Sequence, residues 1–318
     1  MSPASRSKGS TTRGDPAGDR KGRNLRLRAR ILAAVRGFFF EQGYLEVETP
    51  HLLATPLPES HIRFVQTERG VLHPSPELYM KRLLAAGHPR IFQIARCFRD
   101  RERGDRHLRE FTLLEWYCAG SDYRGLMETC EAMIRFAARA VDRASPMRYQ
   151  GREIDLEGAW ERITVAGAFE RYAPEPLEEA ISHGRFEEDL VVHVEPRLGA
   201  PRPVFLHDYP ASMASLARLS PAAPEVSERV ELYLGGLEIA NGFSELTDPE
   251  EQRRRFERDL EERARLGRRT FPVPEVFLEA LDRMPEAAGM ALGIDRLAMV
   301  LTDSARIDDV VAFTPEDG

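Results

Sequence analysis

Residues 230–245 of the chain, VELYLGGLEIANGFSE, are typical of a β-hairpin. Two runs of aliphatic and aromatic residues flank Gly235-Gly236, and a Gly-Gly pair between such runs favours a two-residue hairpin loop. This loop sets the register, because it pairs Leu234 with Leu237. The face on which every later side chain of the hairpin lies can then be counted.

In this register Tyr233 faces Glu238, and Glu231 lies on the same face as Tyr233. The two glutamates are therefore predicted to be diagonal neighbours, about 7 Å apart at the backbone. Two like charges so placed favour a cation between them, and oxygen ligands of this kind suit Mg²⁺ that also contacts nucleotide phosphates. Two exposed glutamates that repel each other weakly in water would also explain the pair.

The next polar residues of the hairpin, Asn241 and Glu245, fall on the opposite face if the alternation is strict. A pocket shared with Glu238 therefore requires a β-bulge, for which Gly242 is a candidate.

Upstream, residues 91–117 predict two strands joined by a long polar loop. Several arginines in such a loop favour binding of a polyphosphate, because guanidinium groups bind phosphate oxygens bidentately. In or beside the loop lie Arg99, Arg101, Arg103, Arg106, His107 and Arg109.

The second strand of this unit carries Phe111, Leu113, Glu115 and Tyr117 on one face. Glu115 and Tyr117 thus project together, either into a pocket or into solvent on an exposed strand face. Near the carboxyl end, residues 289–294 predict a buried strand followed by a helix. Arg296 in that helix can bind a phosphate, and Asp295 is most simply its N-cap.

The remaining segments predict the flanking elements. The first 24 residues carry six basic and two acidic residues and almost no large apolar side chain, which is typical of a disordered basic tail. The other predicted elements are a helix over 25–42 that stops at Gly43, a strand over 44–50, a helix over 78–86 opened by Ser75-Pro76-Glu77, and a helix over 123–141.

The composition limits the class of protein. The 318 residues are 42% hydrophobic and 31% charged, with a net charge of −7, which describes a soluble chain without a broad affinity for nucleic acid. No apolar run could cross a membrane or serve as a secretion signal, so we expect a cytoplasmic protein. Cys97, Cys118 and Cys130 lack metal-ligand spacing and suit a reducing compartment.

The order of these features resembles the catalytic domain of class II aminoacyl-tRNA synthetases. Residues 44–50 resemble their motif 1, residues 98–117 motif 2, and residues 289–296 motif 3. The resemblance covers about residues 25–315. It implies an α+β fold in which helices flank an antiparallel sheet, and a homodimer formed through the motif 1 helix and strand.

Within this class the chain looks closest to lysyl-tRNA synthetases, through residues 75–78, 114–117 and 236–246. Those enzymes carry an anticodon-binding domain before motif 1, whereas only the predicted 24-residue tail precedes the first helix here. A stand-alone core, 25–318, resembles the paralogous lysine ligases of elongation factor P. Ser75 and Ala291 stand where synthetases usually have alanine and glycine, and these substitutions accompany a preference for (R)-β-lysine over α-lysine.

The resemblance implies that ATP and Mg²⁺ are used to activate a lysine as an acyl-adenylate, which is then transferred to a lysine of elongation factor P rather than to tRNA. Arg99 and Arg296 would be catalytic, and Glu231 and Glu238 would hold Mg²⁺. The implied ATP site comprises Arg99, Asp100, Arg101, His107, Phe111, Glu238, Ile239, Gly293 and Arg296. The implied amino acid site comprises Ser75, Pro76, Glu77, Glu115, Tyr117, Asn241, Glu245 and Ala291.

The chain also departs from the family pattern. Arg101 stands where motif 2 usually has an adenine-contacting glutamate, and Glu102 follows it. Leu108 and Arg109 replace an asparagine and a proline. Two alternatives therefore stay open: a short lysyl-tRNA synthetase-like enzyme that charges tRNA, and a synthetase-like regulatory subunit without catalysis. The second is disfavoured because Glu231, Glu238 and Arg296 are retained.

Overall fold

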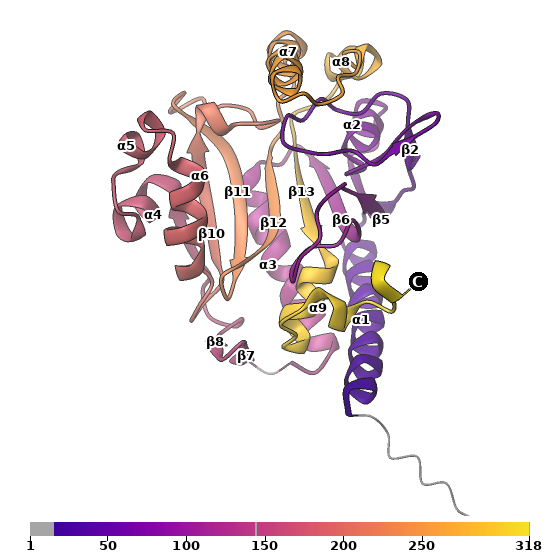
Figure 1. The fold of residues 1–318 in the computed structure, drawn as a ribbon, viewed down its shortest axis with the longest axis vertical. Coiled ribbons are helices and arrows are strands. Elements are labelled where there is room, and N and C mark those ends of the chain that lie inside the picture. Colours follow the sequence, from indigo (N-terminus) through magenta and orange to yellow (C-terminus); the bar gives the residue numbers. More distant parts are fainter. Residues whose placement is uncertain (1–15, 144, 318) are drawn as a thin grey trace, which may run out of the picture.

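The computed structural model describes residues 16–143 and 145–317. Its centre is an eight-stranded sheet, antiparallel except at its two edges, where β1 runs parallel to β5 and β9 parallel to β10 (Figure 1). In pairing order the strands are β1 (Leu45–Glu46), β5 (Arg90–Phe98), β6 (Glu110–Ala119), β13 (Ala287–Gly293), β12 (Leu237–Ser244), β11 (Val226–Leu234), β10 (Val204–Pro210) and β9 (Glu161–Thr164).

Two smaller sheets accompany it, β2 (Leu52–Leu53) with β4 (Gly70–Leu72) and β3 (Gln66–Thr67), and β7 (Met147–Tyr149) with β8 (Arg152–Ile154). The α-helices are α1 (Pro16–Glu41), α2 (Glu77–Ala85), α3 (Tyr123–Ala140), α4 (Val165–Tyr172), α5 (Leu177–Ser182), α6 (Phe186–Asp189), α7 (Pro249–Arg265), α8 (Glu275–Leu281) and α9 (Ile294–Thr302). The predicted α+β class with a mostly antiparallel sheet is confirmed. No described helix is long and apolar enough to cross a membrane.

One face of the large sheet is covered by helices and forms the main hydrophobic core. Helices α1, α3 and α9 pack against it, and Figure 1 shows α3 behind the strands. Phe39 of α1 stacks on Phe92 of β5 with 4.9 Å between ring centroids and also contacts Trp116 of β6. Burial of these large side chains stabilises the sheet, which leaves its other face free for polar groups.

Helix α1 begins at Pro16, nine residues before the start predicted at Leu25, so the predicted start of the helix was wrong. Asn24 is fully buried, and its Nδ2 donates to Ser304 Oγ at 3.0 Å and to the Asp309 carbonyl at 3.1 Å. The hydrophobic pattern did not predict this part of the helix, because residues 16–24 are mostly polar. Asn24 joins it to the carboxyl-terminal segment by hydrogen bonds instead of apolar contacts. The rest of the predicted tail, residues 1–15, lies outside the described residues.

Asp295 does not cap helix α9, contrary to the prediction; Gly293 stands at the N-cap without a side-chain bond. The Asp295 carboxylate is buried, accepts from the Thr112 backbone N–H at 2.7 Å and forms an ion pair with Arg28 at 2.6 Å. It therefore joins α1, β6 and α9. The predicted strand over 44–50 is also shorter, with only Leu45–Glu46 paired to β5.

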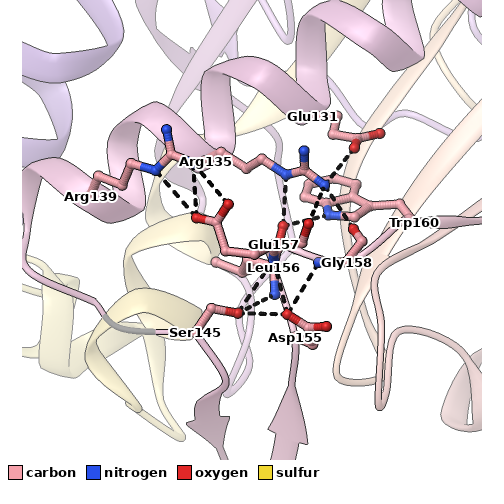
Figure 2. A network of polar contacts seen from close by, with 9 residues as sticks. All are labelled: Glu131, Arg135, Arg139, Ser145, Asp155, Leu156, Glu157, Gly158 and Trp160. Carbon is pink, nitrogen blue, oxygen red and sulfur yellow. Dashed lines mark hydrogen bonds and ion pairs between the residues drawn. The ribbon is translucent and has the colours of Figure 1, made fainter.

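The segment between β8 and β9 is tied to helix α3 by a polar network (Figure 2). Arg135 of α3 donates to the carbonyls of Leu156 and Gly158, each at 2.7 Å, and also pairs with Glu131. A hydrogen bond from Ser145, followed by backbone N–H donors, lowers the pKa of Asp155. The network holds this segment on the helical side of the sheet.

We predict that Asn24→Ala destabilises the protein by about 1–2 kcal/mol, because it leaves buried acceptors without their donor. The midpoint of urea unfolding measures this change. Arg26→Ala, at an exposed position of the same helix, is the control and should leave the midpoint unchanged. Equal midpoints for the two variants would contradict a structural role for this end of α1.

Candidate active site

Two joined cavities lie on the face of the sheet opposite the main core. They share Arg99, Leu113, Asn241 and Ala291. The Arg296 cavity, about 310 Å³, is also lined by Glu102, Arg106, His107, Phe111, Glu238, Ile239, Gly293 and Arg296. The Glu115 cavity, about 290 Å³, is also lined by Glu59, Ser75, Glu77, Glu115, Tyr117, Arg229, Phe243 and Gly289.

The hairpin register explains how the polar side chains reach one face. Leu234 pairs with Leu237 and Tyr233 with Glu238, as predicted. The bulge, however, is at Ile239 rather than Gly242, because the register shifts between Tyr233 and Leu232, which pairs with Ala240.

The extra residue turns Asn241 to the face of Glu231, its partner across the strands, and of Glu238. Gly242 serves a different purpose, since a Cβ there would lie 2.7 Å from the Gly289 carbonyl oxygen of the neighbouring strand.

The predicted common face of β6 is confirmed by its pairing with β13. Tyr117 lies opposite Gly289 and Glu115 opposite Ala291. A side chain at Gly289 would collide with the Tyr117 ring at 2.2 Å and with Glu245 Oε1 at 2.6 Å. Glycine therefore keeps this end of the Glu115 cavity open.

Glu115 is held by two hydroxyl donors at the base of its cavity. Ser75 Oγ donates to one carboxylate oxygen at 2.5 Å, and Tyr117 Oη donates to the other at 3.0 Å. Ser75 Oγ also accepts from the Glu77 N–H at 3.0 Å, so the start of α2 is joined to β6. Burial, and then the nearby Glu77, raise the pKa of Glu115 to about 8.

Lys81 of α2 supports the acidic cavity, and the sequence reasoning missed it. Its Nζ lies 2.5 Å from Glu77 Oε1 and 2.5 Å from Glu245 Oε2, and its side chain is 1% exposed. Burial alone would lower the pKa of Lys81, but Glu245 and Glu77 together raise it. The signal was available, because Lys81 falls on the buried stripe of α2 between Leu78 and Leu84.

Two buried acceptors at this end of the cavity lack a donor. Glu245 Oε1 and Asn241 Oδ1 have no hydrogen-bond partner among the described residues. Burial raises the pKa of Glu245, and Lys81 opposes that rise. Unpaired buried acceptors are costly, so this end of the cavity is suited to a ligand with several N–H donors, such as an ammonium group.

Arginines dominate the Arg296 cavity. Arg296 Nη1 pairs with Glu238 at 3.1 Å, and its Nη2 lies 2.6 Å from His107 Nε2. Partial burial, and then Arg296, lower the pKa of His107 to about 4, so its imidazole is neutral near pH 7. The Arg99 guanidinium lies over the Phe111 ring at 5.2 Å. This cavity offers a cationic wall and an aromatic face.

Three residues of the predicted site lie apart from the lining of both cavities. Asp100 and Arg101 form a loose ion pair at 3.8 Å, with the Arg101 side chain 70% exposed. Arg101 adopts a positive φ of 63°, and the carboxylate that follows it, Glu102, lines the cavity instead. Pro76 stands at the N-cap of α2, where it positions Glu77 through the backbone.

Two further predicted residues, Glu231 and Glu245, lie directly behind the lining. Glu245 is bound to Lys81 and lies beside Gly289 of the Glu115 cavity. Glu231 contacts Asn241, which lines both cavities. Both carboxylates therefore border the cavities without lining them.

Glu231 and Glu238 lie on the same face, as the register predicted. Glu231 accepts from Arg229 at 2.7 Å, Tyr233 at 2.7 Å and Asn241 at 3.2 Å, which occupies both of its oxygens. Burial and the nearby Glu231 raise the pKa of Glu238. Within the described part of the chain, no group of three or more His, Cys, Asp or Glu side chains forms a metal site. A cation bound by this carboxylate pair would therefore need further oxygen ligands, such as those of phosphates, and would compete with the donors that now hold Glu231.

The mostly antiparallel sheet, an arginine-lined cavity and a joined acidic cavity define the catalytic fold of class II synthetases. The family described as tRNA synthetases class II (D, K and N) matches residues 16–317. The chain therefore belongs to this family of ligases.

Two kinds of curated relative match the chain. An elongation factor P–(R)-β-lysine ligase of Vibrio cholerae is 37% identical, covering 91% of this chain and 94% of its own length. A lysine–tRNA ligase of Methylobacillus flagellatus is 38% identical over 90% of this chain, and one of Cupriavidus metallidurans is 35% identical over 91%. The chain spans only 61% and 62% of the length of these two tRNA ligases.

We predict that Lys81→Met destabilises the fold by roughly 3–5 kcal/mol, since it leaves two buried carboxylates without their cation. The double variant Lys81→Met/Glu245→Gln should lose less, because one of those charges is removed with the lysine. Urea unfolding at pH 7 measures both variants. A single variant as stable as the parent protein would exclude the ion pair as a structural support.

Proposed function

We propose that the protein activates a lysine with ATP, forming an acyl-adenylate, and transfers the acyl group to a lysine side chain of elongation factor P. One observation carries this proposal. Buried acceptors without a donor lie at one end of the two joined cavities, and the cationic side chain of Arg99 lies where the cavities meet. An amino acid with a cationic side chain would place its ammonium group at the acceptors and its carboxylate at Arg99. The V. cholerae and Vibrio parahaemolyticus relatives named for this reaction match along 94% of their own lengths.

In this proposal Glu115, Tyr117, Asn241 and Glu245 receive the terminal ammonium group of the substrate. Glu77 meets the amino group near the reacting end, and Arg99 binds the carboxylate. An apolar amino acid would leave the buried acceptors unpaired, so it would be rejected by a large factor. The acidic pocket thus supplies the selectivity for lysine.

ATP would occupy the Arg296 cavity, with its adenine against Phe111 and its outer phosphates on His107 and Arg296. Bound Mg²⁺, held by Glu231 and Glu238 together with phosphate oxygens, would offset negative charge on the phosphates. The ion pair between Arg296 and Glu238 at 3.1 Å keeps the guanidinium at the cavity wall before ATP binds.

The reaction then proceeds in two steps. A carboxylate oxygen of the amino acid attacks the α-phosphorus, the bond to the β-phosphate oxygen breaks, and pyrophosphate leaves. Arg99 lies where charge develops on the α-phosphate and stabilises it. In the second step a neutral amine of elongation factor P attacks the acyl carbon, an amide bond forms, AMP leaves with the bonding electron pair, and the amine loses its proton.

The (R)-β-lysine form of the substrate is favoured by two positions beside Glu115. The hydrogen bond from Ser75 fixes one carboxylate oxygen of Glu115 at 2.5 Å, and the Ala291 side chain stands on the wall shared by both cavities. Both positions limit where the backbone of the substrate can lie. The named function of the Vibrio relatives agrees with this choice.

We also propose a homodimer formed through α1 and the strands after it. Phe40, Leu45 and Leu52 expose large apolar side chains there, 54%, 51% and 45% exposed. A dimer interface there would cover these side chains.

The acceptor is tested by incubating the protein with ATP, Mg²⁺ and labelled α-lysine or (R)-β-lysine, and then offering elongation factor P and tRNA-Lys in separate reactions. We expect label from (R)-β-lysine on elongation factor P. Label on tRNA alone would instead support a lysine–tRNA ligase, which the relatives with that name make the second candidate. Failure to form an adenylate with either amino acid would favour the regulatory subunit. Arg99→Ala is the inactive control.

The affinity for the amino acid should increase as the pH rises from 6.5 towards 8. The pKa of Glu115 is raised to about 8, so its carboxyl binds a proton below that pH, whereas an ammonium ligand favours the carboxylate. Binding therefore releases a proton, and affinity changes by up to about tenfold per pH unit. Calorimetry in two buffers of different ionisation enthalpy measures the proton release. Glu115→Gln should bind more weakly and lose its share of the pH dependence; an unchanged dependence would assign it to Glu59 or Glu245, whose pKa values burial also raises.

A further inference from the structure

Glu59 lies on the wall of the Glu115 cavity, and the proposed mechanism does not use it. It lies between β2 and β3, in a segment fixed by helix α7. Arg263, 2% exposed, donates from Nη1 to the Glu59 carbonyl at 2.5 Å and to the Ile62 carbonyl at 2.8 Å. The Ser60 N–H donates to Asp259 at 3.3 Å. The backbone beneath the Glu59 side chain is therefore anchored on both sides.

Within the described part of the chain, the Glu59 carboxylate lacks the side-chain partners that hold its neighbours. Glu77 and Glu245 share Lys81, and Glu115 accepts from two hydroxyl groups. Across residues 16–143 and 145–317, no Lys, Arg or His nitrogen lies within 4.0 Å of the Glu59 carboxylate oxygens. Burial, and then Glu77, raise the pKa of Glu59 to about 7, with Arg99 and Lys81 too distant to reverse that rise.

The charges around the cavity are thus out of balance. Arg229 on its wall is already paired with Glu231 at 2.7 Å, so this pair adds no net charge. Four carboxyl groups, Glu59, Glu77, Glu115 and Glu245, face two cations, Lys81 and Arg99 (4 − 2 = 2). The carboxylate of a bound amino acid raises this excess to three. A second ammonium group on the ligand lowers the remaining excess from two to one, which favours a diamino acid.

The position of Glu59 indicates which ammonium group it meets. The Arg63 carbonyl, four residues further along the same segment, accepts from the Asp100 N–H at 2.7 Å, which holds the segment beside Arg99, the residue assigned to the substrate carboxylate. The unpartnered Glu245 Oε1 and the Tyr117 ring, by contrast, flank Gly289 at the far end. Glu59 therefore lies near the amino group next to the reacting carboxylate.

We propose that Glu59 is a specificity-determining residue that binds this second amino group, together with Glu77. The inference deepens the proposed function and rests on it. α-Lysine and β-lysine differ only in the carbon that carries this amine, so a carboxylate on the wall of the cavity acts at the point where the two substrates differ. Glu59 then selects diamino acids over monoamino acids.

The test compares Glu59→Gln with the parent protein for three ligands: (R)-β-lysine, α-lysine and 6-aminohexanoate, which lacks the second amine. The dissociation constant of each is measured by calorimetry or by competition, and adenylate formation by pyrophosphate exchange. We expect Glu59→Gln to weaken binding of the preferred diamino acid by about 10–100-fold, as the loss of a buried charge pair does. Binding of 6-aminohexanoate should change by less than about threefold.

Matched variants separate this role from a loss of folding. Glu68→Gln, in the exposed turn between β3 and β4, should change none of the constants. Glu59→Asp retains the charge and should recover part of the affinity. Glu245→Gln should weaken all three ligands, because it acts on the ammonium group that they share.

An equal loss for 6-aminohexanoate, or no loss for the diamino acids, would overturn the role of Glu59 while leaving the proposed function intact. A parent protein that binds and activates neither diamino acid would overturn both. Loss of all binding in Glu59→Gln with an unchanged melting temperature would also contradict the proposal, because such a loss does not distinguish the two amines.

Discussion

The single extra residue in strand β12, Ile239, is the constraint on which the site depends. Side chains of a strand alternate between its faces, so a shift of one residue exchanges core and pocket. Without the bulge, Asn241 and Glu245 would face the apolar helical layer that contains Trp116, where an uncompensated carboxylate is costly. With the bulge, the polar residues of both halves of the hairpin reach one cavity.

The acidic cavity is stable because protein donors offset part of its charge and a ligand must offset the rest. Lys81 is bound by two glutamates, and two hydroxyl groups hold Glu115. Two acceptors, Glu245 Oε1 and Asn241 Oδ1, remain without a donor among the described residues, and burial beside Glu77 raises the pKa values of Glu59 and Glu115. In the proposed function, the ammonium group of the ligand supplies the contacts that the fold leaves open.

The sequence permitted prediction of the features with strong local patterns. The Gly-Gly loop determined the hairpin register, and strand alternation placed Glu115 and Tyr117 together. Residues 16–24 and Glu59 could not be predicted in this way, because neither segment has an apolar period and both are positioned by distant partners. The bulge was anticipated but misplaced, since glycine is only one way to accommodate an extra residue.

The two faces of the sheet contribute differently to the free energy of folding. The helical face buries stacked aromatic side chains and supplies stability, whereas the other face holds carboxylates whose burial opposes folding. Asp295 connects the two tasks, because it binds Arg28 of the covering helix α1 and the Thr112 N–H on the strand that carries Glu115. Arg296, the next residue, is thereby fixed at the wall of its cavity. A change in the packing of α1 is consequently transmitted to the arginine that would meet the phosphates, although no described residue of α1 lines either cavity.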